Sequence, residues 1–189
     1  MNLEDIKNFS GFILPAEKEE HERWGNISKK ALELFYTDKT DKFVDLYNCE
    51  FTSIEDKIDA LTILLMAVVE IEESDLRKIL RFREHIVKTE DNNFIYLFDD
   101  AMFQAGITSP EEFIQSIDDG IRKDVPIAYV IKSFFYYYGL NDYESSVQAI
   151  KNVIILEPNN LEYKEILKNF KEEAEEGFPW NKESVDKYR

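Results

Sequence analysis

The sequence predicts an all-α fold of antiparallel helical hairpins, without a sheet. Six glycines and five prolines are few for an all-β protein, which needs many tight turns. The clearest helical stretch runs from Gly139 to Phe170. In its first half, apolar residues recur at the spacing of one helical face, at Val147, Ile150, Val153 and Ile154.

Residues 1–50 are predicted to form an irregular N-terminal helical cap. Pro15 starts a helix that Gly25 ends, and Asn26 caps the next helix. A short apolar segment follows around Phe43, Leu46 and Tyr47. Since an array of stacked helices needs a cover over its apolar end, we interpret this region as that cover rather than as a degenerate repeat.

Residues 51–90 are predicted to form the core hairpin. Thr52 and Glu55 have the spacing of a capping box, and the apolar run that follows covers nearly every face of one helix. That run is too short to span a bilayer, so it predicts a central core helix. Ser74 is expected to cap the second helix, which carries a basic patch that we interpret as neutralising neighbouring acidic helices: Arg77, Lys78, Arg81 and Arg83.

Residues 91–176 contain an internal repeat, predicted to give two hairpins and a capping helix. Gly106 and Gly139 lie 33 residues apart, and their surroundings align without a gap. In this alignment the predicted cap Ser109 matches the predicted cap Asp142. Residues 177–189 form a polar tail, from which Trp180 is expected to fold back onto the final helix.

The second repeat resembles a tetratricopeptide repeat over about residues 127–160. The resemblance is carried by Asp142-Tyr143, which open the second helix, by Pro158-Asn159-Asn160, which close it, and by a period near the family's roughly 34 residues. The family's small positions are Ser146 and Val153 here, and the first helix is crowded with aromatic residues. The earlier unit keeps the architecture without the signature.

The resemblance implies a short α-solenoid in which the first helix of each hairpin lines a concave groove. Those first helices are expected at Phe94–Ala105 and Ile127–Tyr138. With Tyr129, Ser133 and Tyr136 as packing positions, the next residues face the groove. The predicted partner-binding residues are therefore Leu97, Ala101, Gln104, Val130, Phe134 and Tyr137. Because residues 134–138 are all aromatic, at least one of them is expected to be exposed as a binding anchor.

Length and charge limit the classes of function. A chain of 189 residues is expected to form a single domain, residues 1–189. Its 39 acidic and 23 basic residues give a net charge of −16, which disfavours direct nucleic-acid binding and an anionic membrane surface and favours a basic protein partner. The single Cys49 excludes an internal disulfide, and the N-terminus has no secretory pattern, so we expect a cytoplasmic protein.

No catalytic, cofactor or metal constellation is predicted. His21 and His85 lie far apart, and Cys49 has no nearby base in the sequence. Neighbouring carboxylates such as Asp99-Asp100 and Asp118-Asp119 point about 100° apart on a helix, so they do not converge. Carboxylates from different helices can still bind Mg²⁺, which keeps an acidic metal-dependent enzyme as the lowest-ranked alternative.

We therefore expect a non-catalytic protein-binding module that uses an acidic helical-repeat surface to bind a basic partner protein or peptide. The alternative is an immunity-type inhibitor or nucleic-acid mimic that blocks a basic toxin or nuclease. The two differ in their response to salt, because a charge mimic loses its association rate as salt rises, whereas a groove binder tolerates salt.

Overall fold

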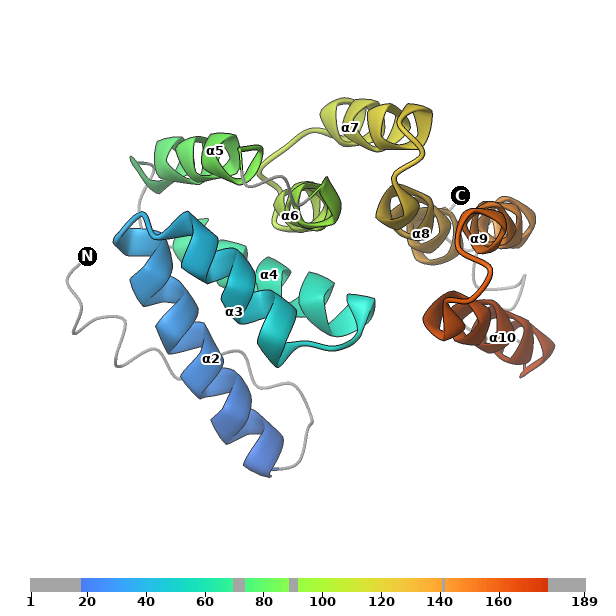
Figure 1. Ribbon diagram of the computed structural model, residues 1–189, viewed down its shortest axis with the longest axis horizontal. Coiled ribbons are helices and arrows are strands. Elements are labelled where there is room, and N and C mark those ends of the chain that lie inside the picture. Colours follow the sequence, from blue (N-terminus) through green and yellow to red (C-terminus); the bar gives the residue numbers. More distant parts are fainter. Residues whose placement is uncertain (1–17, 70–73, 89–91, 141, 177–189) are drawn as a thin grey trace, which may run out of the picture. The chain divides into compact units, whose positions relative to one another are not determined.

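The computed structural model describes residues 18–69, 74–88, 92–140 and 142–176, and every regular element in these ranges is helical (Figure 1). The all-α prediction is thus confirmed for the described residues. The contacts divide the chain into two compact units, Met1–Phe113 and Ile114–Arg189. The prediction of a single domain stays a prediction. The predictions for Pro15, for the side chain of Ser74 and for Trp180 lie outside the described residues.

Unit 1 contains five described helices around a shared core. Helix α4 packs along α6 and also contacts α2 and α5, while α3 packs against α2 and α5 (Figure 1). The predicted N-terminal cap thus shares its core with the predicted core hairpin. The helices are α2 (Lys18–Tyr36), α3 (Thr40–Glu50), α4 (Ile54–Val69), α5 (Ser74–Ile86) and α6 (Asn92–Gln104).

The core of unit 1 is a cluster of aromatic rings from four helices. The Phe82 ring of α5 lies 4.9 Å from Phe35 of α2 and 4.8 Å from Phe43 of α3, measured between ring centroids. Phe94 and Phe98 of α6 complete the cluster, at 6.2 Å from Phe43 and 6.1 Å from Phe82 respectively. Such edge and tilted contacts stabilise beyond simple area burial, so this cluster fixes α5 against its neighbours.

Two helix boundaries in unit 1 differ from the prediction. Helix α2 continues through Gly25 and Asn26, so the predicted break there is wrong. A single glycine costs a helix only about 1 kcal/mol, and its neighbours here favour helix. Helix α4 is capped by Ser53 instead of Thr52: the Ser53 hydroxyl accepts a hydrogen bond from the Asp56 amide at 3.1 Å.

Helix α4 is buried on one wide face, not on most sides as predicted. Leu61, Leu64 and Leu65 are almost fully buried, whereas Met66 is exposed. Acidic side chains at Glu55 and Asp56 are also exposed. The helix is therefore amphipathic, and its hydrophobic face carries the packing against α6.

Unit 2 contains most of α7, followed by a row of helices in which α9 contacts both α8 and α10. Ser133 of α8 and Ser146 of α9 are fully buried, and each hydroxyl donates to a carbonyl of its own helix at 2.7 Å. These small, internally satisfied residues suit closely packed helices. The elements are α7 (Pro110–Arg122), α8 (Pro126–Phe134), the π-helical turn η1 (Phe135–Gly139), α9 (Tyr143–Leu156) and α10 (Leu161–Glu176).

The repeat is visible in the element order, and this order is compatible with a helical repeat fold. Helices α7 and α9 begin 33 residues apart. The predicted caps are confirmed at Ser109, which exchanges two hydrogen bonds with Glu112, and at Asp142, which accepts from the Ser145 amide at 3.0 Å.

The packing of the two repeats is not equivalent. Helix α6 packs on α4, whereas α8 packs on α9, and the boundary between the units falls inside α7. The aligned glycines also differ. Gly106 has a φ of 71°, which favours glycine, whereas a Cβ at Gly139 would lie 3.4 Å from the Phe135 ring. The shared sequence pattern therefore fixes where helices form, while their contacts differ.

Candidate functional site

The three predicted groove residues of α6 do not form an open surface in unit 1. Leu97 and Ala101 are buried in the core of the unit, so the expectation that they face a partner is corrected. Gln104 is exposed, and its amide nitrogen donates to the Asp100 carboxylate at 2.7 Å. Only Gln104 among these three is accessible to another molecule.

The groove residues predicted in unit 2 show that the assumed helical register was wrong. Val130 and Tyr137 are buried, while Phe134 is half-buried. The buried stripe runs through Val130, Ser133 and Tyr137, and the turn from Phe135 to Gly139 is π-helical. Because a π turn contains an extra residue, the residues after Phe134 do not keep the register of an ordinary α-helix.

A row of large side chains is exposed where η1 turns into α9. We call Tyr138, Leu140 and Tyr143 the aromatic edge; they are 47%, 56% and 37% exposed. Beneath them Tyr137 is only 3% exposed, and its ring stacks on Phe170 of α10 with centroids 4.2 Å apart. The expectation that at least one of the five consecutive aromatic residues is exposed is thus met at Tyr138.

The two tyrosines of the aromatic edge pack on buried aromatic rings. The Tyr138 ring lies edge-on to Tyr137 at 4.9 Å and contacts Phe170 at 6.3 Å, and Tyr143 lies 6.4 Å from Tyr137. Exposed rings that are held by buried ones lose little conformational entropy on binding. The edge is therefore preorganised for contact with another molecule.

Acidic residues flank Tyr143 of the aromatic edge in the sequence, and Glu173 neighbours the buried Tyr137 beneath it. The hydrogen bonds from Ser145 lower the pKa of Asp142, so this carboxylate is ionised at neutral pH. Burial first, and then the neighbouring Glu173 carboxylate, raise the pKa of Tyr137. Glu144, in the first turn of α9, is exposed. The edge thus combines aromatic surface with negative charge.

The basic patch predicted on α5 is partly neutralised. Arg83 forms two hydrogen bonds with the buried carboxylate of Asp99, at 2.5 and 2.7 Å, and Lys78 pairs with Asp38 at 3.1 Å. Arg77 and Arg81 are exposed and pair with no carboxylate within the part of the chain that the structure describes. The neutralising role therefore applies to two of the four residues.

Asp100 is the most perturbed carboxyl group of unit 1. Burial raises its pKa to about 7, the Gln104 hydrogen bond opposes the shift, and the Asp59 and Asp99 carboxylates add to it. The sequence places Asp99 and Asp100 side by side but does not show that their environments differ. Asp99 has a guanidinium partner, whereas Asp100 lies in the core without one.

The carboxylates do not assemble a metal site among the described residues, where no group of three or more His, Cys, Asp or Glu side chains is placed to hold an ion. In unit 2, Asp118 pairs with Lys132 at 3.0 Å and Asp119 pairs with Lys123. None of the described helices is long and apolar enough to cross a membrane.

Comparison with protein-family models, with curated proteins and with solved structures finds no match for this chain.

Proposed function

We propose that the chain is a non-catalytic protein-binding module whose contact surface is the aromatic edge of unit 2. The observation that carries this proposal is the exposure of Tyr138, Leu140 and Tyr143 over the stacked rings of Tyr137 and Phe170. Tyrosine is enriched at the centres of protein interfaces, because its ring provides apolar area while its hydroxyl provides a hydrogen bond.

The chemistry of the edge favours a partner that presents Lys or Arg. A cation over the face of an exposed tyrosine ring is attracted by the ring, and nearby carboxylates strengthen that attraction. Asp142 and Glu144 supply such carboxylates. The net charge of −16 adds long-range attraction that accelerates encounter with a basic protein.

The test is capture of partners from a lysate with the wild-type chain, followed by titration of the partner that is recovered. Tyr138→Ala and Tyr143→Ala should weaken its binding by at least about 1 kcal/mol, or roughly fivefold in Kd. Leu161→Ala is the matched control, since Leu161 is an exposed apolar residue of unit 2 outside the edge. Equal binding by all three variants would refute the proposed surface.

The charge of −16 also supports a second candidate, an inhibitor that mimics nucleic acid and blocks a basic toxin or nuclease. Ionic strength separates the two functions. A charge mimic loses its association rate steeply as salt rises, while the tyrosine variants leave its affinity nearly unchanged. Binding through the aromatic edge tolerates salt and depends on Tyr138.

A further inference from the structure

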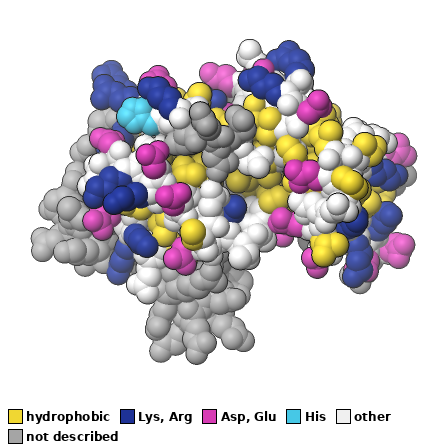
Figure 2. Space-filling model, viewed as in Figure 1, with side chains coloured by type: hydrophobic (Ala, Val, Ile, Leu, Met, Phe, Trp, Pro, Cys, Tyr) yellow, Lys and Arg dark blue, Asp and Glu magenta, His cyan; other side chains and the backbone are white. Residues whose placement is uncertain are grey.

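Helix α5 of unit 1 presents a continuous basic face to solvent. Arg77, Arg81, His85 and Lys88 follow one another at spacings of four, four and three residues, so they line one side of the helix and its C-terminal extension. All four side chains are exposed. Figure 2 shows Lys and Arg side chains, in dark blue, grouped over the position of α5 at upper left. We call this row the α5 basic face.

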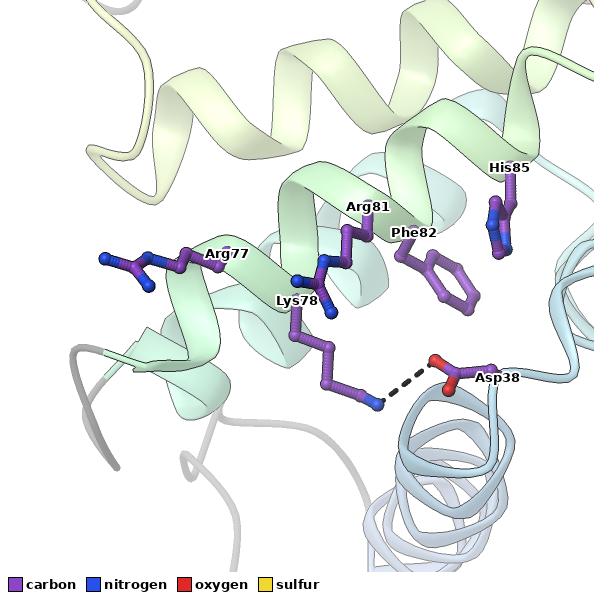
Figure 3. A pocket seen from close by; sticks show the side chains of 6 residues that line it. All are labelled: Asp38, Arg77, Lys78, Arg81, Phe82 and His85. Atoms are coloured by element: carbon purple, nitrogen blue, oxygen red, sulfur yellow. Dashed lines mark hydrogen bonds and ion pairs between the residues drawn. The ribbon is translucent and has the colours of Figure 1, made fainter.

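The surface beside this row is concave. One hollow, of about 410 Å³, is lined by Arg77, Lys78, Arg81, Phe82, His85 and Asp38. Figure 3 shows the arginine, lysine and histidine side chains projecting from α5, with Asp38 opposite Lys78 in the turn after α2. A second hollow, of about 450 Å³, shares Asp38 and His85 and adds Lys39, Lys42 and Lys88, together with Thr40 and Asp41.

The Lys78 side chain forms contacts within unit 1. Its ammonium group pairs with Asp38 at 3.1 Å and lies over the rings of Phe35 and Tyr36, at 5.6 and 5.4 Å from their centroids. It therefore neutralises Asp38 and forms part of the wall of the hollow. Arg77 and Arg81 have no such partner within the described residues, so their guanidinium groups are available to another molecule.

The charge of this face is opposite to that of its surroundings. The sequence of unit 1 contains 25 acidic and 13 basic residues, so the basic row is not part of a generally basic surface. Among the side chains that the structure describes, three carboxylates lie near it: Asp38, which pairs with Lys78, Asp41 in the second hollow, and the exposed Glu84 on α5. The free cations still dominate the row.

An apolar border runs along the other side of the row. Leu80 of α5 and Val87 in the turn that follows it are 49% and 57% exposed, and their spacing of seven residues places them on the same side. A free phosphate has no apolar group that could contact this border. A peptide that carries carboxylates beside apolar side chains matches both the charge and the border.

We propose that the α5 basic face binds an acidic amphipathic helix of a partner protein. The row from Arg77 to Lys88 rises about 16 Å, or about three helical turns. Carboxylates at i, i+4 and i+8 of a partner helix repeat at the same interval as Arg77, Arg81 and His85. A guanidinium group binds a carboxylate through two parallel hydrogen bonds, and the partner's apolar residues cover Leu80 and Val87. Nucleic acid is disfavoured, because a sugar–phosphate backbone carries no apolar side chains that could cover Leu80 and Val87.

The probe is a fluorescein-labelled peptide of about three helical turns with Glu at every fourth position, Leu beside each Glu and Ala elsewhere. Its control has Gln in place of Glu. Anisotropy is measured at physiological ionic strength, where the Debye length of about 8 Å screens distant acidic groups but not a contact pair. The wild-type chain should bind the Glu peptide at least about tenfold more tightly than the Gln peptide.

The matched variants are Arg77→Glu/Arg81→Glu and Lys29→Glu/Lys30→Glu, which change the net charge equally. Lys29 and Lys30 are exposed on α2 of the same unit. The first variant should lose at least about tenfold in affinity for the Glu peptide, whereas the second should retain most of it. Circular dichroism checks that both variants keep the helical content of the wild type.

Several results would overturn the proposal. Equal binding of the two peptides, or equal loss in the two variants, means that the face does not recognise carboxylates specifically. Displacement of the Glu peptide by inorganic phosphate assigns the hollow to a small anion, and tighter binding of a single-stranded oligonucleotide assigns it to nucleic acid. Self-association that Arg77→Glu/Arg81→Glu abolishes assigns the face to a second copy of the chain. These results leave the function proposed for unit 2 unaffected, because the two surfaces share no residue.

Discussion

Replacing Asp100 by Asn should stabilise the folded chain, and increasingly so as the pH rises. Asp100 is 6% exposed, and burial raises its pKa to about 7. In the unfolded chain the pKa of an aspartate is about 3.9. Between these values the folded state holds a proton that the unfolded state has released. The cost of burying this carboxyl group is therefore absent at low pH, grows from about pH 4 to about pH 7, and is complete above that.

The size of the effect follows from the difference between the two pKa values. Three pKa units correspond to about 4 kcal/mol, which is an upper bound on the cost at alkaline pH. An Asn side chain has nearly the same shape and never ionises, and its amide oxygen can accept the hydrogen bond that Gln104 now donates at 2.7 Å. The stability gained by Asp100→Asn should increase by about 2 kcal/mol between about pH 5.5 and pH 8.

The measurement is urea unfolding of both proteins, followed by circular dichroism across this pH range. Taking the difference at each pH removes the contribution of the other carboxyl groups, which are common to both proteins. Asp99→Asn is the control on the neighbouring residue. It should destabilise by about 1–3 kcal/mol at every pH in this range, because it weakens the pairing with Arg83. A loss of stability in Asp100→Asn that does not change with pH would show that Asp100 is ionised in the folded state.

Three further predictions concern the packing and the caps. Leu64→Ala should lower the free energy of unfolding by about 2–5 kcal/mol in chemical denaturation, since Leu64 is almost fully buried, and a loss below about 1 kcal/mol would contradict its place in the core. Tyr137→Ala should cost about 3–5 kcal/mol through loss of its stacking on Phe170, while Tyr138→Ala should shift the melting temperature by only a few degrees; similar shifts for both would contradict the assigned burial. Ser109→Ala should cost about 1 kcal/mol in thermal unfolding, whereas the same change at the exposed Thr52 should be nearly neutral.

Local patterns in the sequence located the helices well. The predicted caps at Ser109 and Asp142 coincide with hydrogen bonds in the structure, because a cap and the first turn that it stabilises lie within four residues of each other. The break predicted at Gly25 was wrong for a related reason. The residues on both sides of Gly25 favour helix, and together they outweigh the small helix penalty of a single glycine. A prediction based on the glycine alone does not include their contribution.

The orientation of the helices was harder to predict. Every residue from Phe134 to Tyr138 is aromatic, so apolar periodicity contains no information on which of them is buried. The stacking of Tyr137 on Phe170 of α10 sets which side of this segment is buried. The π-helical turn also shifts the helical register of the residues that follow Phe134. For this reason Tyr137, which we predicted to line a groove, is buried, while its neighbour Tyr138 is exposed.

The all-α class, the helical segments of the repeat and the acidic character of the chain could all be predicted before any packing was known. Periodicity and caps depend on residues close together in the chain, and net charge is the sum over all residues. The packing of separate helices sets which carboxylate of the Asp99-Asp100 pair gains a guanidinium partner, and which cations of α5 stay free. It also decided that the basic row and the turn after α2 border one hollow. Such pairings join side chains of separate helices. They depend on the angle at which the two helices cross, and that angle is set by packing over the whole contact between them. A short stretch of sequence contains no information on this packing.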